Sequence, residues 1–203
     1  MMINNAKVGV VDDEPAVLKS LIRLLSSAGY DAHGMQSSRD LLNSKILDDF
    51  ECLVVDLKMP DIDGLELQRE LTASKKDCSV IFLSGEGDVG TSVSAMKGGA
   101  IDFLTKPVDA DSLFAAVTTA LDEARQRRHE RMKIELIRTR FEMLTLREKQ
   151  VFEGVVEGLL NKQIGARLGT AEKTIKVQRA HVMEKMGARS VADLVRMAEK
   201  IFK

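Results

Sequence analysis

The chain has 203 residues, of which 44% are hydrophobic and 30% are charged, so it can form one or two small globular domains. It does not begin with the apolar segment and cleavage site of a secretory signal, and no apolar run approaches the ~18 residues of a membrane span. We therefore expect a cytoplasmic protein with no membrane partner. Cys52 and Cys78 are expected to be buried, reduced thiols, since disulfides are rare in that compartment.

The formal net charge of −1 conceals opposite charges in the two halves. Residues 1–120 contain 11 Lys and Arg against 19 Asp and Glu, a net charge of −8. Residues 121–203 contain 19 Lys and Arg against 12 Asp and Glu, a net charge of +7. This asymmetry predicts two domains with different partners, and the basic one is a candidate for binding nucleic acid.

Strand-like and helical patterns alternate through the first half. Apolar runs predict strands at 7–11, 31–35, 52–56, 79–84 and 101–105. Helical periodicity appears at 16–28, 39–46, 65–73 and 89–97, and again from 111 onward. Because the strands are apolar on both faces, we expect a doubly wound α/β fold with a five-stranded parallel sheet.

Polar side chains follow several of these strands. Asp12 and Asp13 follow the first, Asp56 ends the third, Ser84 ends the fourth and Lys106 follows the fifth. Ligands of parallel sheets bind at the carboxyl ends of the strands. A cluster of carboxylates there is unfavourable alone, and Mg²⁺ would relieve the repulsion. A carboxylate can also attack a phosphoryl group, whose oxygens a hydroxyl and an ammonium would stabilise.

Four motifs carry these residues in a fixed order: VVDDE (10–14), VVDLKMPDIDG (54–64), LSGEGD (83–88) and DFLTKP (102–107). Together, over about residues 6–121, they resemble the signatures of the response-regulator receiver domain, which has a flavodoxin-like fold. The resemblance implies that Asp56 is the phosphoacceptor, reached by the phosphohistidine of a kinase. It further implies a role for each of the remaining positions: Asp12, Asp13, Asp56 and the Lys58 carbonyl as Mg²⁺ ligands, Ser84 as the switch hydroxyl, Lys106 as the phosphate-sensing lysine, Phe103 as the switch aromatic, and a cis peptide at Lys106-Pro107.

Lys58 bears on two questions: whether the chain is a phosphatase, and how long a phosphoryl group would stay on Asp56. A phosphatase of the haloacid-dehalogenase type would carry a second Asp two residues after the first, where this chain has Lys58. Lys58 and Glu86, each two residues beyond a strand-end site residue, could pair above Asp56 and slow hydrolysis of its phosphate. Alternatively, both side chains are solvated and never meet.

The stretch from Ser112 to Leu144 contains no Gly or Pro and predicts one long helix, mostly charged between 123 and 133. It is either a solvated connector or a helix that packs against a second copy through Met132, Leu136 and Phe141. We accordingly expect a receiver at 1–121, a helical linker at 122–142 and a third segment at 143–203.

The last segment has the pattern of four short helices, two of them joined as a helix-turn-helix. The runs LTLRE, NKQIGARLG and KTIKVQRAHVMEKMG resemble the LuxR/FixJ-type DNA-binding domain, except that Gln178 stands where the family commonly has His. The resemblance implies a small all-α domain that binds double-stranded DNA.

Within its longest helix, Ile175, Val182 and Met186 fall on one face and are expected in the core. On the other side, Lys176, Val177 and His181 are candidates for base edges, with Thr174 beside them. Lys162, Lys173 and Arg179 are candidates for phosphate contacts. Arg179 could instead form an intramolecular salt bridge, and His181 could be solvent-exposed without a partner.

Together, the two resemblances imply a transcriptional regulator of a two-component system and not an enzyme. Phosphorylation of Asp56 is expected to promote dimerisation and operator binding. The expected partners are a cognate sensor histidine kinase, double-stranded DNA, a second copy of the chain and RNA polymerase. A regulator of this architecture that phosphate does not switch is the alternative.

Overall fold

The computed structural model describes residues 6–74, 76–85 and 89–202. The chain divides into two compact units, one reaching Arg128 and the other beginning at His129. Among the described residues, no helix combines the length and the apolar character required to cross a bilayer.

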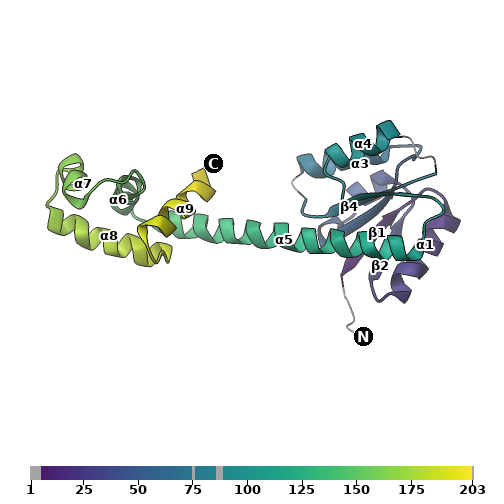
Figure 1. Cartoon of the computed structure of the whole chain (residues 1–203), viewed down its shortest axis with the longest axis horizontal. Coiled ribbons are helices and arrows are strands. Elements are labelled where there is room, and N and C mark those ends of the chain that lie inside the picture. The colour runs from purple at the N-terminus through teal and green to yellow at the C-terminus, as the bar shows by residue number, and fades with distance from the viewer. Residues whose placement is uncertain (1–5, 75, 86–88, 203) are drawn as a thin grey trace. The chain divides into compact units, whose positions relative to one another are not determined.

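The first unit alternates strands and helices as the sequence predicts (Figure 1). The strands are β1 (Lys7–Val11), β2 (Asp31–Met35), β3 (Cys52–Asp56), β4 (Ser79–Ser84) and β5 (Asp102–Thr105). The helices are α1 (Pro15–Ser27), α2 (Ser38–Leu42), α3 (Gly64–Ala73), α4 (Val89–Lys97) and the beginning of α5 (Ala110–Glu142). One prediction was wrong, because the helix expected at 39–46 ends at Leu42 and is followed by a 3₁₀ turn, η1 (Leu47–Asp49).

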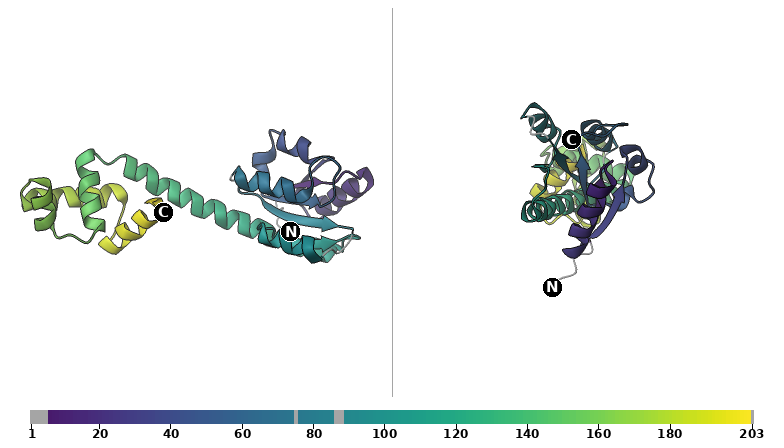
Figure 2. Two further views of the ribbon diagram at one scale, coloured as in Figure 1. Left: turned by 90° about the horizontal axis from the view of Figure 1, so that it is seen from above. Right: turned by 90° about the vertical axis from the view of Figure 1, so that its right-hand side faces the viewer.

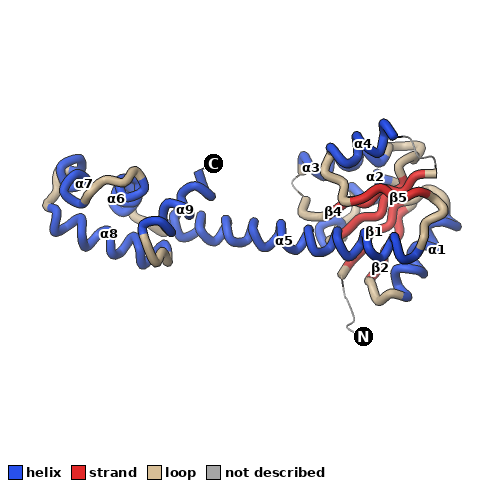
Figure 3. The backbone as a smooth tube through the Cα atoms, viewed as in Figure 1, coloured by secondary structure: helices blue, strands red, loops and turns tan. Residues whose placement is uncertain are grey.

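The five strands form one parallel sheet in the order β2-β1-β3-β4-β5 (Figure 3). This is the doubly wound, flavodoxin-like order, in which the chain reverses direction across the sheet between β1 and β3. Val11 at the end of β1 pairs with Val55 near the end of β3. The residues that follow these two strands therefore emerge side by side at the carboxyl edge of the sheet.

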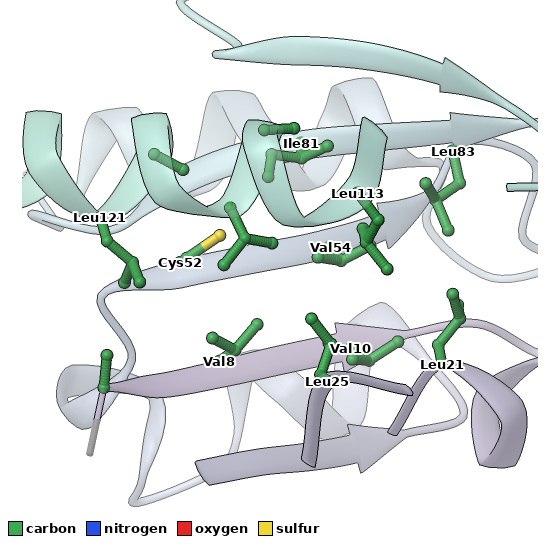
Figure 4. Close-up of a cluster of buried hydrophobic side chains, with 14 of the residues drawn as sticks. Val8, Val10, Leu21, Leu25, Cys52, Val54, Ile81, Leu83, Leu113 and Leu121 are labelled. Atoms are coloured by element: carbon green, nitrogen blue, oxygen red, sulfur yellow. The ribbon is translucent and has the colours of Figure 1, made fainter. Parts of the chain in front are cut away.

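Both faces of the sheet are covered by apolar side chains. Cys52 and Val54 of β3 pack in one cluster with α1 and α5 (Figure 4), whereas Leu53 and Val55 pack in the other with α2 and α3. This explains why the strands read as continuous apolar runs. Both cysteines are free thiols, but Cys52 is buried as expected whereas Cys78 is only half-buried. Burial raises the pKa of Cys52 far above its ordinary value and that of Cys78 to about 11.

Helix α5 is one unbroken helix of 33 residues, as the absence of Gly and Pro predicts (Figure 2). Within the first unit, two arginines attach it to the strands. Arg125 Nε lies 3.2 Å from Glu51 Oε2, and Arg127 Nη2 donates to Ser79 Oγ at 2.6 Å. Ser79 is the first residue of β4, so these contacts hold α5 at the amino end of the sheet.

The second unit contains the end of α5 with α6 (Leu146–Val156), α7 (Asn161–Leu168), α8 (Glu172–Met186) and α9 (Val191–Phe202). Thr145 and Glu148 form the predicted capping box of α6. Gly169 ends α7 with a φ of 63°, a left-handed conformation that favours glycine. A Cβ at Gly165 would lie 2.8 Å from the Thr170 carbonyl oxygen, so this glycine permits the tight turn into α8.

The three apolar residues expected to face a partner along α5 behave differently. Met132 and Leu136 are 58% and 52% exposed. Phe141 instead packs in the core of the second unit, with its ring centroid 5.1 Å from those of both Phe152 and Phe202. An intermolecular role for Phe141 is therefore not supported by its position.

Candidate functional site

The carboxyl edge of the sheet brings three of the predicted site residues together. Asp12 directly follows β1, and Asp56 is the last residue of β3. Lys106 follows β5, and its backbone N–H donates to the Ser84 carbonyl at 2.7 Å, which continues the pairing of β4 with β5. The Lys106-Pro107 peptide is cis, as expected.

Lys106 bridges the two carboxylates. Its Nζ lies 2.7 Å from Asp12 Oδ2 and 2.9 Å from Asp56 Oδ1. The other oxygen of Asp12 accepts the Glu14 backbone N–H at 3.0 Å, whereas Oδ2 accepts no hydrogen bond of good geometry. The ammonium at 2.7 Å is the charge that faces this buried oxygen.

Burial determines how these groups ionise. Asp12 is fully buried, Asp56 is 6% exposed and Ser84 is also buried, while the Lys106 side chain is 17% exposed. Burial raises the pKa of Asp56, and the neighbouring Asp12 and Asp13 act in the same direction, against the opposing effect of Lys106. Burial acts to lower the pKa of Lys106, but its close contacts with the negatively charged carboxylates of Asp12 and Asp56 outweigh that effect and raise the pKa. Lys106 therefore stays charged, while burial disfavours the ionised form of the neighbouring Asp56.

The other predicted members surround this centre less closely. Asp13 and Lys58 are exposed, and Phe103 of β5 is half-buried beside Phe82 of β4. Glu86 lies outside the described residues, so its pairing with Lys58 stays a prediction.

The loop after Asp56 is fixed by close packing. The Gly64 backbone N–H donates to the Leu57 carbonyl at 3.0 Å, and a Cβ at Gly64 would lie 2.9 Å from the Asp56 carbonyl oxygen. Ser38 of α2 donates its hydroxyl to the Ile62 carbonyl at 3.0 Å. The role of Ser38 could not be predicted from the sequence, because nothing local to Ser38 shows that it reaches a loop 24 residues away.

The donor set at this edge suits a hard cation. Within the described ranges, no three Asp, Glu, His or Cys side chains are already gathered as a metal site. Mg²⁺ nevertheless needs only one or two carboxylates, because it keeps several waters and shares phosphoryl oxygens. The Asp56 carboxylate and the buried Asp12 carboxylate, whose Oδ2 now faces the Lys106 ammonium, meet that requirement.

Helix α8 presents two distinct faces. Ile175, Val182 and Met186 are fully buried, which confirms the predicted core stripe. The candidate DNA-contacting residues on the other side are exposed, as is Lys162 on α7; those on α8 are Lys173, Thr174, Lys176, Val177 and His181.

Arg179 differs from these candidates because it is half-buried and already engaged. Its Nη1 donates to Asn161 Oδ1 at 3.0 Å, so its partner is a neutral amide and not the acidic residue of a salt bridge. The contact joins α8 to the start of α7. The adjacent Gln178 is also half-buried, and its Oε1 accepts no hydrogen bond.

Two contacts that the sequence did not reveal hold the end of α8. Lys185 Nζ lies 2.7 Å from Glu148 Oε2. This hydrogen bond, reinforced by the Thr145 N–H, lowers the pKa of Glu148 to about 2. Arg140 of α5 donates Nη1 to the Met186 carbonyl at 3.0 Å.

Comparisons with known proteins agree with both halves of this architecture. The response regulator receiver domain family matches residues 8–118, and the family described as bacterial regulatory proteins, luxR family, matches residues 142–198. Nodulation protein W of Bradyrhizobium diazoefficiens is 42% identical over 97% of this chain and 86% of its own length. The transcriptional regulatory protein FixJ of Azorhizobium caulinodans is 43% identical over 97% and 93%, respectively.

Solved structures show the same likeness. The response regulator StyR superposes with a TM-score of 0.81 at 38% identity, covering 97% of this chain and 99% of StyR. Full-length FixJ from B. japonicum gives a TM-score of 0.58 at 36% identity, with 96% of each chain covered. Since the receiver family spans more than half of the sequence and these relatives match nearly all of it, the chain belongs to the response regulators that join a receiver domain to a LuxR-family DNA-binding domain.

Proposed function

We propose that Asp56 accepts a phosphoryl group from a cognate sensor histidine kinase and that this modification controls binding to duplex DNA. The observation that carries the proposal is the meeting of Asp12, Asp56 and Lys106 between β1 and β3. This is the place where doubly wound sheets bind their ligands. The charged lysine offers the positive charge that incoming phosphoryl oxygens require.

The chemistry follows from the position of Asp56. A carboxylate oxygen forms a bond to phosphorus as the phosphorus–nitrogen bond of the kinase phosphohistidine breaks, and the imidazole leaves. Lys106 and the Ser84 hydroxyl then stabilise the new phosphoryl oxygens, and Phe103 responds as the switch aromatic. Burial raises the pKa of Asp56, so its carboxylate oxygen is more basic and a better nucleophile toward phosphorus.

Magnesium is the cofactor that this donor set would take. Asp12, Asp13, Asp56 and the Lys58 carbonyl oxygen would hold it, with water completing the shell. When bound, Mg²⁺ neutralises charge on the phosphoryl group during transfer.

DNA binding is assigned to the exposed face of α8. Lys176, Val177 and His181 are placed against base edges with Thr174 beside them, and Lys162 and Lys173 against phosphates. Arg179 is a weaker phosphate candidate, since binding DNA would compete with its bond to Asn161. We propose that phosphorylation promotes a homodimer, which would read two half-sites, and that RNA polymerase is a further partner.

The domain assignment in this proposal is a receiver at 1–121, a linker at 122–142 and a DNA-binding domain at 143–203, acting in the cytoplasm. A regulator that phosphate does not switch is disfavoured, because Asp56 and Lys106 are both present and in contact.

Phosphorylation is tested with acetyl phosphate and Mg²⁺, with intact mass spectrometry as the readout. Wild type is expected to gain one phosphoryl group, and Asp56→Asn none. Asp61→Asn is the matched control, since Asp61 is an exposed aspartate of the same loop and should leave labelling unchanged. Equal labelling of wild type and Asp56→Asn would overturn the assignment.

A further inference from the structure

The final turns of α5 contact the recognition helix α8 directly. Arg140, half-buried in the second unit, donates its Nη1 to the carbonyl of Met186 at 3.0 Å. Met186 is the last residue of α8, where carbonyls lack a partner within the helix. A guanidinium there supplies both a hydrogen bond and a positive charge at the negative end of the helix dipole.

Gly187 is matched to this arginine. Its φ of 68° lies in the left-handed region, and a Cβ at this position would lie 2.5 Å from Arg140 Nη1 and 3.2 Å from its Cζ. Glycine therefore meets two needs at once: it ends α8, and it leaves room for the guanidinium. Arg140, the Met186 carbonyl and Gly187 together form a joint.

Apolar residues of the same part of α5, Ile137 and Phe141, pack against the core that α8 shares with the other helices of the unit. Glu130 pairs with Lys200 of α9 at 2.5 Å, and the Phe141 ring packs against Phe152 of α6 and Phe202 of α9. Arg140 differs from these residues because it makes a hydrogen bond to the backbone of the recognition helix. At the other end of the same unbroken helix, Arg125 and Arg127 bind Glu51 and Ser79 of the receiver.

We infer that Arg140 is a positioning residue for DNA binding: it ties the end of α8 to α5, so that a change imposed on α5 by the receiver alters how α8 is presented. The inference rests on the proposed function, in which α8 binds DNA under the control of Asp56. It names α5, through Arg140, as the element that connects the receiver to α8. Arg140 itself touches neither DNA nor the phosphoryl group in this scheme.

The test uses the full chain and a duplex selected from a random-sequence pool by the acetyl-phosphate-treated wild type. The measured quantity is the ratio of affinities for that duplex with and without acetyl phosphate. Arg140→Ala is expected to compress this ratio about fivefold or more, the lower end of typical coupling between sites. Arg140→Lys, which keeps a charged donor, should restore most of it. Arg138→Ala, an exposed arginine of the same helix, is the matched control for lost charge and should leave the ratio unchanged.

The ratio separates coupling from a merely structural role. If Arg140 only stabilised the fold, its loss would weaken binding equally with and without acetyl phosphate, and the ratio would not change. Such a result, or an unchanged ratio with unchanged affinities, would overturn the inference. If the wild type itself bound no duplex, or bound it equally in both states, the proposed function would fail instead. Circular dichroism verifies that each variant is folded, and Arg140→Gln replaces Arg140→Ala if the latter is not.

A double substitution gives an independent outcome. Gly187→Ala strains the backbone and displaces the guanidinium, so in wild type it should also compress the ratio. In the Arg140→Ala background only the strain remains, and Gly187→Ala should leave the ratio where Arg140→Ala has set it. Additive effects on the ratio would mean that the two residues do not form one joint.

Discussion

Removing the Lys106 ammonium should destabilise the receiver in a pH-dependent way. Lys106→Ala leaves the buried carboxylates of Asp12 and Asp56 without the charge that lies 2.7 Å and 2.9 Å from them. Breaking a buried ion pair by deleting one partner typically costs ~3–5 kcal/mol. Since the Lys106 side chain is 17% exposed and admits some water, we expect about 3 kcal/mol near neutral pH.

The pH dependence follows from Asp56. Its pKa lies above 3.8 in the folded wild type, mainly because of burial, and removal of Lys106 takes away the opposing effect and raises it further. When the pKa of a carboxyl is higher in the folded state than in the unfolded state, the group has no effect on stability at low pH, where it is protonated in both states. It destabilises the fold as pH rises through its folded-state pKa. The deficit of Lys106→Ala should therefore be smallest in acid and largest at neutral pH.

The intrinsic fluorescence of Tyr30 can be used to measure this change in stability. Tyr30 is the one tyrosine of a sequence without tryptophan, and its hydroxyl lies 3.4 Å from Thr118 Oγ1 inside the receiver. Urea unfolding followed by Tyr30 fluorescence thus reports on this unit. Lys97→Ala, at an exposed lysine of α4, is the control and should change little. Adding Asp56→Asn to Lys106→Ala should recover stability at neutral pH. A deficit that grows in acid, or that Asp56→Asn does not relieve, would refute the electrostatic explanation.

Two further predictions concern the second unit. Lys176→Ala and Val177→Ala should change sequence preference by ~1–3 kcal/mol in binding to a set of single-base variants of a selected duplex. Lys162→Ala should instead weaken all sequences alike and reduce the salt slope, so a changed preference at an unchanged slope would reverse these assignments. Glu148→Gln keeps an acceptor for Thr145 but loses the Lys185 ion pair, at a cost of about 1 kcal/mol because Lys185 is 40% exposed. The depressed pKa of Glu148, about 2 against 4.5, places that stability above pH 4.5 and removes it as pH falls toward 2, so urea unfolding of variant and wild type should converge in acid.

Local sequence patterns predicted the positions of most elements. The strands were identified because their apolar runs end abruptly at Asp12, Asp56 and Ser84, and the sheet edge follows from the rule for parallel strands. The wrong prediction of where α2 ends also has a local cause. Asn43 caps that helix, and the Ser44 hydroxyl accepts the Ile46 N–H, so turn chemistry prevailed over the apolar periodicity of Leu42 and Ile46.

Contacts between distant side chains could not be predicted in this way. The sequence placed Lys106 near two carboxylates, but its equal approach to Asp12 and Asp56 depends on the strand order. Phe141 was assigned to a surface because its aromatic partner Phe202 comes from the end of the chain. The contact of Arg140 with the Met186 carbonyl could not be predicted, because in the sequence a single arginine of a charged helix looks the same as its solvated neighbours.

Contacts within its own unit hold helix α8 in place. Three of its side chains are fully buried in the core, its last turn is capped at Gly187, and Arg179 fixes it to α7. The conformational entropy of this helix is consequently lost when the protein folds and not when it binds. Association with DNA should then show a heat-capacity change that reflects the contact surface alone, and this change should be much smaller than that of coupled folding and binding. The far-ultraviolet circular dichroism of the protein should likewise show no gain of helix on the duplex.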